Sequence, residues 1–391
     1  MIYALTGITG LLGRNLFLEI IKKNRNDLFK TKFILFGRNS KTKTLKVRVL
    51  EILRDELSNY IDDKSFDFNQ IDKFVSENIK FIHYSLGTKN LDLSKEDLSY
   101  LKDKKIDFFL HIAALTDFRN SNLVKKNLDL INIEGTKNIL DLCSSINIKE
   151  FDYISSAYVC GMTTGIISPE YINLDQDFRN HYEKTKLIAE IFVKNFCKEK
   201  NINFKIFRPS TISGRLVEKE IGKTNKFDVF YAWANFFLRR KIKYLNGQGD
   251  AILTPYITNI RYQIYFKSGL NIIPADHCAK MLLNCISHSN ETYFHLTSKE
   301  ELSHDFYLQE MLNMMNIKGC TPVENIPLTQ NKEEILYYNT VGKIFDKYIN
   351  NKPIYFDLKS AEINNMTAPL ITKQDFRKIM KFAINHKLGI K

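Results

Sequence analysis

Tyr182, Lys186 and Ser156 have the residue types and positions of a proton-transfer set. Tyr182 and Lys186 lie four positions apart at the start of a predicted helix, so both side chains fall on one helix face. A nearby ammonium group stabilises a phenolate, and we therefore predict that Lys186 lowers the pKa of Tyr182 toward the range of acid–base catalysis. Ser156 ends a predicted strand, where its hydroxyl would hold a substrate oxygen. We interpret the three residues as catalytic, although Tyr–Lys pairs at this spacing also occur on ordinary helix surfaces.

A glycine-rich loop near the start of the chain offers a place for an anionic ligand. Gly7, Gly10 and Gly13 lie between an apolar run at residues 2–5 and a predicted helix at residues 11–21. Glycine permits a tight turn and a close approach of the backbone to a pyrophosphate, which the helix N-terminus then attracts. We predict that this loop binds a dinucleotide through Thr6, Gly7, Thr9, Gly10, Leu11, Leu12, Gly13 and Arg14.

The end of the second predicted strand, at residues 32–37, indicates which dinucleotide binds. NAD sites usually carry an acidic residue there, which accepts a hydrogen bond from the ribose 2′-hydroxyl. This chain instead has Arg38 after Gly37, and no acid follows closely. Arg38, helped by Arg14, would pair with a 2′-phosphate, so we predict NADP(H) rather than NAD(H) as cofactor. The alternative for Arg38 is a solvated loop cation.

Alternating apolar strands and amphipathic helices must position these residues. Such alternation is typical of a parallel sheet covered by helices on both faces, with right-handed crossovers. We therefore predict an α/β fold with a doubly wound parallel sheet, and we interpret the polar residues 62–78 as a surface insertion. The expected strands are 2–5, 32–37, 81–86, 107–114, 151–156, 204–207 and 293–297, and the expected helices include 11–21, 45–61, 127–144 and 182–200.

The alternation stops after Pro209, which suggests a second lobe. We assign residues 1–209 plus about 265–297 to an NADP-binding domain. Residues 210–264 and 298–391 would form a smaller, mostly helical substrate-binding lobe. Its aromatic residues are expected either to form the lobe core or to line a substrate tunnel, and the basic residues after them either to face an anionic partner or to end a solvated helix. These are Phe227, Phe230, Tyr231, Trp233, Phe236 and Phe237, followed by Arg239, Arg240, Lys241 and Lys243.

Composition limits the classes of protein that fit the chain. Its 391 residues are 44% hydrophobic and 26% charged, which excludes a disordered chain and a disulfide-stapled miniprotein. The net charge of +13 favours anionic partners, but no basic run is long enough for a nucleic-acid arm, so we expect no nucleic acid partner. Six cysteines lack CxxC or zinc spacing, and we expect free thiols, no metal site and a cytoplasmic protein. No signal peptide or transmembrane segment is predicted.

Taken together, these motifs resemble the extended short-chain dehydrogenase/reductases. The glycine loop at residues 6–13, Ser156, Tyr182 and Lys186 match that superfamily in order and spacing. Further stretches are similar to one branch, the thioester reductase domains and fatty acyl-CoA reductases, and the resemblance covers roughly residues 2–297. These stretches are residues 111–118, 132–136, 153–161, 207–214 and 271–277.

The resemblance implies a Rossmann-type fold and NADPH-dependent reduction of an acyl thioester to an aldehyde or alcohol. The substrate would be an acyl-CoA or an acyl group on an acidic carrier protein, and a homodimer is an open alternative. Ser85 stands where the family usually has an Asp near the adenine, which leaves that contact uncertain. The remaining cofactor contacts implied by the resemblance are Ala113, Ala114, Ser155, Pro209, Ser210 and Thr211, with Tyr182 and Lys186.

Two other functions share parts of this pattern. A nucleotide-sugar epimerase or dehydratase uses the same Ser/Tyr/Lys set, but an acid after the second strand would have favoured that function. A nonenzymatic dinucleotide-sensing protein would commonly have lost the Tyr or the Lys, and both are present.

Several other polar residues are expected to be structural rather than catalytic. We expect His111 to be a core histidine, His181 to lie at the surface and Asp276 to cap a helix. Asn132 is expected either to anchor a water in a proton relay or to be a helix-packing amide.

Overall fold

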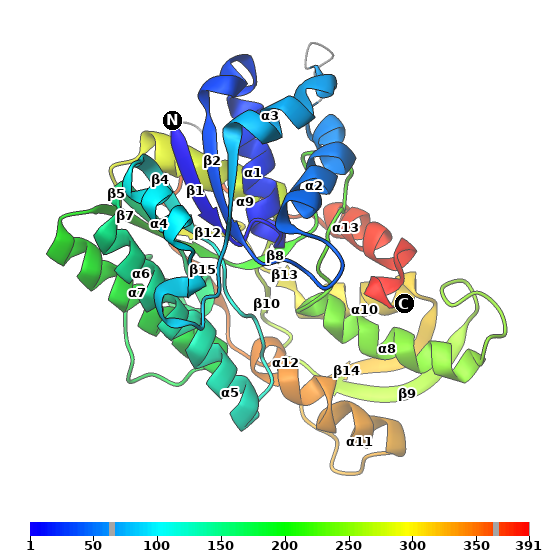
Figure 1. Ribbon diagram of the computed structural model, residues 1–391. Helices are drawn as coiled ribbons and strands as arrows, with labels where there is room; N and C mark the ends of the chain where they lie inside the picture. The colour runs from blue at the N-terminus through cyan, green and yellow to red at the C-terminus, as the bar shows by residue number, and fades with distance from the viewer. Residues whose placement is uncertain (62–66, 363–366, 391) are drawn as a thin grey trace.

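The computed structural model describes residues 1–61, 67–362 and 367–390, and a sheet of seven parallel strands lies at its centre (Figure 1). The strand order is β12-β7-β5-β4-β1-β2-β3, and every neighbouring pair is parallel. The order reverses between β1 and β4, where doubly wound sheets leave a crevice for ligands. The strands are β1 (Ile2–Thr6), β2 (Lys32–Gly37), β3 (Ile79–His83), β4 (Lys105–His111), β5 (Asn147–Ile154), β7 (Asn203–Pro209) and β12 (Tyr293–Leu296).

Helices cover both faces of this sheet, as the apolar strands require. Residues 3–6 and 33–36 are all buried, because parallel strands lie between two helical layers. The predicted doubly wound α/β fold is confirmed. One layer contains α1 (Leu11–Lys23), α2 (Leu45–Tyr60), α3 (Ile71–Asn78) and α9 (Ala275–His288), and the other contains α4 (Lys95–Lys102), α6 (Gly135–Ser145) and α7 (His181–Lys200).

The interpretation of residues 62–78 as a surface insertion is wrong for its second half. Residues 62–66 lie outside the described residues, but α3 occupies 71–78 and buries Ile71, Phe74 and Val75 against the sheet layer. These three residues have helical spacing, and the polar residues between them hid the pattern.

The helix expected at 127–144 begins earlier and changes geometry in its middle. Ser121 caps α5 (Asn122–Leu128), because its hydroxyl accepts a hydrogen bond from Val124 N. A π-helical turn at Asp129–Glu134 then joins α5 to α6. π turns are frequent at functional sites, and this one contains Asn132.

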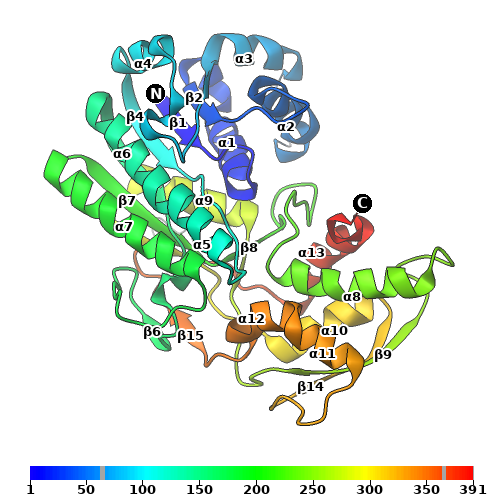
Figure 2. The ribbon, with the colours of Figure 1, turned by 60° about the horizontal axis from the view of Figure 1, so that its bottom comes forward.

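A second group of elements has its own hydrophobic core. Figure 2 shows these elements side by side at one end of the molecule, where the chain also ends. Trp233, Tyr262 and Phe376 are buried in this core, so the second lobe does not depend on the sheet for its interior. Strands β9 and β14 form a parallel pair that the mostly helical expectation did not include. The elements are α8 (Phe230–Leu245), β9 (Tyr256–Gln263), α10 (His304–Met314), β14 (Ile317–Val323), α11 (Lys332–Asn339), α12 (Val341–Ile349) and α13 (Lys373–Asn385).

Short strand pairs connect the two parts. β8 (Thr211–Ser213) pairs with β11 (Ile272–Pro274), and β6 (Gly165–Ile167) pairs with β15 (Ile354–Phe356). The two separate cores support the proposed division into a cofactor domain and a substrate lobe, whose boundaries remain a prediction. In the described part of the chain, no helix has the length and apolar character needed to cross a bilayer.

Candidate active site

A cavity of about 550 Å³ opens at the carboxyl ends of the central strands. Its lining residues follow β1, β2, β3, β4, β5 and β7, at the switch point where the strand order reverses. Ser156, Tyr182 and Lys186 all line this one cavity, together with most of the predicted cofactor contacts. The latter are Gly7, Thr9, Gly10, Leu11, Leu12, Gly13, Arg38, Ala113, Ala114, Ser155, Pro209, Ser210 and Thr211.

The glycine loop lines one side of the cavity, and two of its glycines have no room for a side chain. Gly7 has φ +73°, and a Cβ atom on it would lie 2.8 Å from Ala113 N. A Cβ atom on Gly13 would lie 2.3 Å from the carbonyl oxygen of Gly7. No side chain caps α1, whose N-cap is Gly10, so the first amide groups of the helix remain for an anionic ligand.

Thr6 and Arg14 do not line the cavity. The Thr6 hydroxyl accepts hydrogen bonds from Ile112 N at 3.0 Å and Ala113 N at 3.1 Å, so it joins β1 to the end of β4. Arg14 forms an ion pair with Glu56 at 2.5 Å, and the other oxygen of that carboxylate accepts from Arg215. The expectation that Arg14 helps Arg38 is therefore not met, because a buried carboxylate on α2 engages it.

The residue beside Arg38 is instead Arg48, which the sequence analysis missed. Arg48 lies in the first turn of α2, lines the cavity and donates a hydrogen bond to the Arg38 carbonyl oxygen at 3.1 Å. Lys226 and Asp228 also line the cavity and pair with each other at 2.5 Å. The two arginines therefore make this end of the cavity positive, which suits a phosphate group.

The proton-transfer set comes from two adjacent elements. Tyr182 and Lys186 lie in the first turns of α7, whose N-cap residue Asn180 accepts a hydrogen bond from Glu183 N at 3.1 Å. Ser156 is the second residue after β5, where its hydroxyl accepts from Tyr158 N at 3.2 Å. The side chains of all three catalytic candidates meet in the cavity because β5 and α7 are neighbours in the fold.

Burial changes the acid–base properties expected of this set. Desolvation raises the pKa of Tyr182 above its ordinary value. A hydrogen bond with the Thr116 hydroxyl lowers this pKa by a smaller amount. Desolvation also lowers the pKa of Lys186 to about 7, and the nearby negative charge of Glu190 raises it only in part. The predicted lowering of the Tyr182 pKa by Lys186 is thus wrong for this structure, because burial disfavours the charged form of both groups.

The ammonium group of Lys186 has two partners of its own. It donates to the Ile154 carbonyl oxygen at 2.5 Å and lies 4.2 Å from the centroid of the Tyr153 ring. Both contacts offset part of the desolvation of a charged group, and both fix the Lys186 side chain beside the end of β5.

Asn132 connects the loop after β4 to α7. Its Oδ1 accepts from Leu115 N at 2.8 Å, and its Nδ2 donates to the Leu115 carbonyl oxygen and to the Thr185 hydroxyl at 3.0 and 3.1 Å. This geometry supports the packing alternative, because the amide fixes the loop that carries Thr116, the hydrogen-bond partner of Tyr182.

His111 and His181 both lie near the site. His111 is buried between the hydroxyls of Thr6 and Thr136, and burial lowers its pKa to about 3, so the expectation of a core histidine is confirmed. His181 is partly exposed and lies 2.6 Å from Asp129.

Of the two roles expected for the aromatic residues at 227–237, the structure supports the lobe core. Phe230, Tyr231, Trp233 and Phe237 are buried there, and none of the six aromatic candidates appears in the described cavity lining. Phe118, Tyr158 and Tyr348 form an aromatic wall on one side of the cavity, a role that no signal in the sequence indicated, and Phe36 and Tyr84 line the cavity elsewhere.

Arg239, Arg240 and Lys241, near the end of α8, have partners within the lobe, whereas Lys243 is exposed. Lys241 is buried and donates to the carbonyl oxygens of Ile252 and Met315, and Arg240 pairs with Glu333. Arg239 donates to Asn235 at 2.6 Å. These contacts favour a structural role over recognition of an anionic partner.

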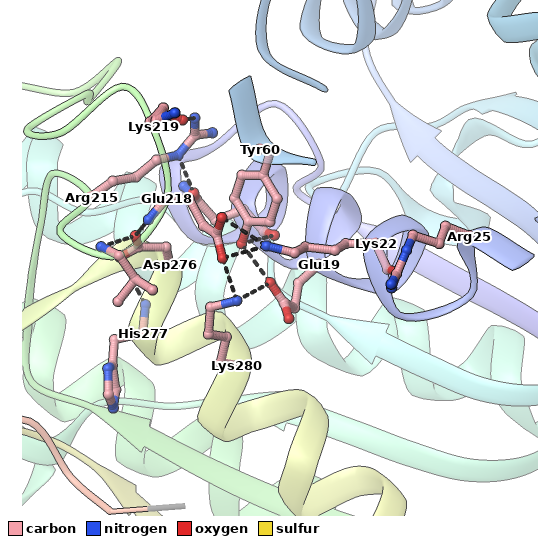
Figure 3. Close-up of polar contacts among 12 residues, drawn as sticks. Glu19, Lys22, Arg25, Tyr60, Arg215, Glu218, Lys219, Asp276, His277 and Lys280 are labelled. Atoms are coloured by element: carbon pink, nitrogen blue, oxygen red, sulfur yellow. Dashed lines mark hydrogen bonds and ion pairs between the residues drawn. The ribbon is translucent and has the colours of Figure 1, made fainter. Parts of the chain in front are cut away.

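Residues 214–229 form a strap that lies next to the glycine loop. Asp276 accepts hydrogen bonds from the backbone amides of residues 216–218, and Glu218 pairs with Lys22 at 2.8 Å and with Lys280 at 2.6 Å (Figure 3). Asn225 then donates to the Thr9 carbonyl oxygen at 3.1 Å. Asp276 was expected to cap α9, but Pro274 holds the N-cap position and Asp276 anchors the strap.

Comparison with known proteins identifies related chains. A family model described as "Male sterility protein", for an NAD-binding domain, matches residues 5–282. The chain is 25% identical over 176 residues to a probable fatty acyl-CoA reductase 5 of Arabidopsis thaliana, a match that covers 45% of this chain and 34% of that protein. The chain thus matches about a third of the length of this curated relative.

Solved structures of the same fold cover nearly the whole chain. The terminal R domain from the myxalamid PKS-NRPS biosynthetic pathway is similar with a TM-score of 0.69 and 17% identity, over 99% of this chain and 91% of that one. A UDP-glucuronic acid 4-epimerase from Bacillus cereus, in complex with UDP-glucuronic acid and NAD, has a TM-score of 0.61 and 15% identity, over 98% and 99%. At these identities the likeness shows the fold.

Proposed function

The chain belongs to the male sterility protein family of NAD-binding domains, and from that premise we propose that it is an NADP(H)-dependent reductase of an acyl thioester. The observation that carries the proposal is the meeting of Ser156, Tyr182 and Lys186 in one cavity with the glycine loop. The acyl group would arrive on CoA or on a carrier protein. Similarity to a probable fatty acyl-CoA reductase and to a terminal R domain supports this substrate class.

The cavity suits a phosphorylated nicotinamide dinucleotide. Gly7 allows the loop to pack directly against the end of β4, where a Cβ atom would collide, and the loop itself lines the cavity in which a pyrophosphate would bind. Arg38 and Arg48 would hold a 2′-phosphate, which supports NADP(H) over NAD(H). The Ser210 hydroxyl is buried in the cavity wall and has no hydrogen-bond partner in the described residues, so it would bond a polar group of the ligand. When bound, the reduced cofactor supplies the hydride.

The catalytic set would stabilise the oxygen of the thioester carbonyl. The raised pKa of Tyr182 keeps its phenol protonated near neutral pH, so it donates a hydrogen bond together with the Ser156 hydroxyl. As hydride adds to the carbonyl carbon, the oxygen takes the Tyr182 proton and a hemithioacetal results. Loss of the thiol from this intermediate leaves the aldehyde. Lys186, with its pKa near 7, would return a proton to Tyr182.

A nucleotide-sugar epimerase is the second candidate, because an epimerase structure shares the fold over nearly the whole chain. Two observations favour the reductase. No acidic residue of the described cavity lining lies beside Arg38 at the end of β2, where an NAD-using enzyme would bind the ribose 2′-hydroxyl. The wall formed by Phe118, Tyr158 and Tyr348 also offers mainly carbon to the substrate.

The purified chain should consume NADPH when an acyl-CoA or an acylated carrier protein is added, as followed by the loss of nicotinamide absorbance. Tyr182→Phe should lower turnover by about 100-fold or more, since general acid catalysis contributes on this scale, while NADPH binding stays intact. Full activity in Tyr182→Phe would contradict the acid assignment. Copurified NAD together with interconversion of nucleotide sugars would instead identify an epimerase.

A further inference from the structure

Tyr348 belongs to the core of the second lobe and also lines the active-site cavity. It lies near the end of α12 and lines the cavity, although it is far beyond residues 5–282, which the family model matches. Its side chain is only 8% exposed. A residue from outside the range that the family model matches therefore lines the same cavity as Ser156, Tyr182 and Lys186.

The hydroxyl of Tyr348 is held by the first turn of the catalytic helix. It donates to Glu183 Oε1 at 2.7 Å and accepts from Asn180 Nδ2 at 2.7 Å. Glu183 is completely buried, and its other oxygen accepts from Arg179 N at 3.0 Å. The hydroxyl thus has both a donor and an acceptor partner on α7, next to Tyr182, and these contacts fix the ring in one orientation.

The ring of Tyr348 completes an aromatic wall beside the proton donor. It stacks on Phe118 with centroids 5.4 Å apart, and Phe118 lies 5.7 Å from the Tyr182 ring. Its edge contact with Tyr158 has a centroid distance of 5.6 Å. Because α7 already binds the Tyr348 hydroxyl, the wall presents carbon rather than polar groups to a substrate.

We infer that Tyr348 is a specificity-determining residue, whose ring holds the hydrocarbon part of the acyl group next to Tyr182. The inference rests on the proposed function and extends it to the substrate. A hydrocarbon chain gains from burial against this wall, whereas sugar hydroxyls would lose their water partners there without replacement. The second lobe would thus select the acyl group, and the sheet domain would bind the cofactor.

Two matched substitutions separate the ring from the hydroxyl. Tyr348→Leu removes the ring but keeps an apolar side chain, and Tyr348→Phe keeps the ring but releases Glu183 and Asn180. We expect the ratio of kcat/KM for a long-chain acyl-CoA to kcat/KM for acetyl-CoA to be about 10-fold or more lower in Tyr348→Leu than in Tyr348→Phe, mainly through KM, since both variants lose the hydroxyl and only the first loses the ring. Tyr348→Phe should keep the chain-length preference. The affinity for NADPH, measured by fluorescence titration, should be unchanged in both.

Phe118→Leu, on the other side of the stacked pair, should shift the chain-length profile in the same way. It serves as the second test if Tyr348→Leu folds poorly. An unchanged profile in every folded ring-removing variant would overturn the inference while leaving thioester reduction intact.

A binding measurement separates this inference from the proposed reaction. A nonreactive long-chain alkyl-CoA thioether should bind the NADP-loaded wild type, and its affinity should fall about 10-fold in Tyr348→Leu by calorimetry. If the wild type reduces no thioester but this loss of affinity is found, the proposed function fails and the inference stands. Equal affinity of both proteins for the thioether would refute the inference.

Discussion

Replacing the buried Lys186 by methionine should stabilise the fold while removing activity. Lys186 is 2% exposed, and its pKa falls from 10.5 to about 7 on folding. At 1.36 kcal/mol per pKa unit, this shift corresponds to a cost of roughly 5 kcal/mol for folding with a charged lysine. Loss of the hydrogen bond to Ile154 would leave a buried carbonyl without its donor and offset about 1–3 kcal/mol of the gain. We therefore expect Lys186→Met to raise the free energy of unfolding by about 2 kcal/mol at pH 7.

The stability difference between Lys186→Met and the wild type should change with pH in one direction. A lysine whose pKa is lowered by folding destabilises the folded state fully below pH 7, where it must be charged in both states. The cost fades as the pH rises from 7 toward 10.5, because the folded state then holds Lys186 neutral. The advantage of Lys186→Met over the wild type should shrink across the same interval.

Urea unfolding of both proteins at several pH values between 6 and about 10 measures this difference, since other titrating groups contribute equally to both. Cofactor-free protein should be used, because bound NADP(H) would add its own stabilisation. A variant that is less stable than the wild type at pH 7, with a difference that does not change with pH, would refute the argument from desolvation.

Three further changes test other parts of the cavity. Gly7→Ala should cost about 2 kcal/mol or more in the free energy of unfolding, by urea titration, and weaken NADPH binding, because φ is +73° and the new Cβ would meet the end of β4. Arg38→Ser with Arg48→Ser should weaken NADPH relative to NADH by about 10- to 100-fold in fluorescence titrations, since two charged hydrogen-bond donors to a phosphate are lost. Asn132→Ala should lower kcat more than NADPH affinity, because the loop carrying Thr116 loses its anchor on α7.

The first two of these changes have matched control variants, and the third is judged by comparing kcat with NADPH affinity. Gly165→Ala also places alanine at positive φ, +85°, but in open space, so it isolates the backbone cost from the collision. Arg14→Ser removes a cation that pairs with Glu56 outside the cavity and should leave the NADPH/NADH ratio unchanged. A change of that ratio in Arg14→Ser, or none in the double variant, would contradict the assignment of the phosphate site. Equal losses of kcat and NADPH affinity in Asn132→Ala would argue for general misfolding.

Much of the sheet domain could be predicted, because its signals are local. The glycine loop, the apolar strands and the Tyr182–Lys186 spacing each depend on neighbouring residues of one element. The strand alternation then limits how these elements can be arranged, and the family inferred from the motifs is confirmed by the match over residues 5–282. Boundaries moved by a few residues, as at β3, because strand ends depend on pairing with the neighbouring strand.

The roles of Arg14, Arg48 and Asp276 could not be predicted, because they depend on which elements pack against each other. Arg14 and Arg48 are both basic residues in first turns of helices, and nothing in their neighbourhoods tells which one pairs with Glu56 and which one reaches the cavity. The role of Asp276 likewise required the strap at residues 214–229 to lie over α9.

Periodicity and short spacings were enough to predict the doubly wound sheet, and to select the glycine loop and Ser156, Tyr182 and Lys186 as candidate site residues. Only the tertiary structure decided the pKa values of Tyr182 and Lys186 and which aromatic residues line the cavity beside them. Desolvation acts on a side chain through everything packed around it, so the pKa directions of Tyr182 and Lys186 could not be read from their spacing. Tyr348 reaches the cavity across a long stretch of sequence, because packing of the second lobe against α7 brings it there.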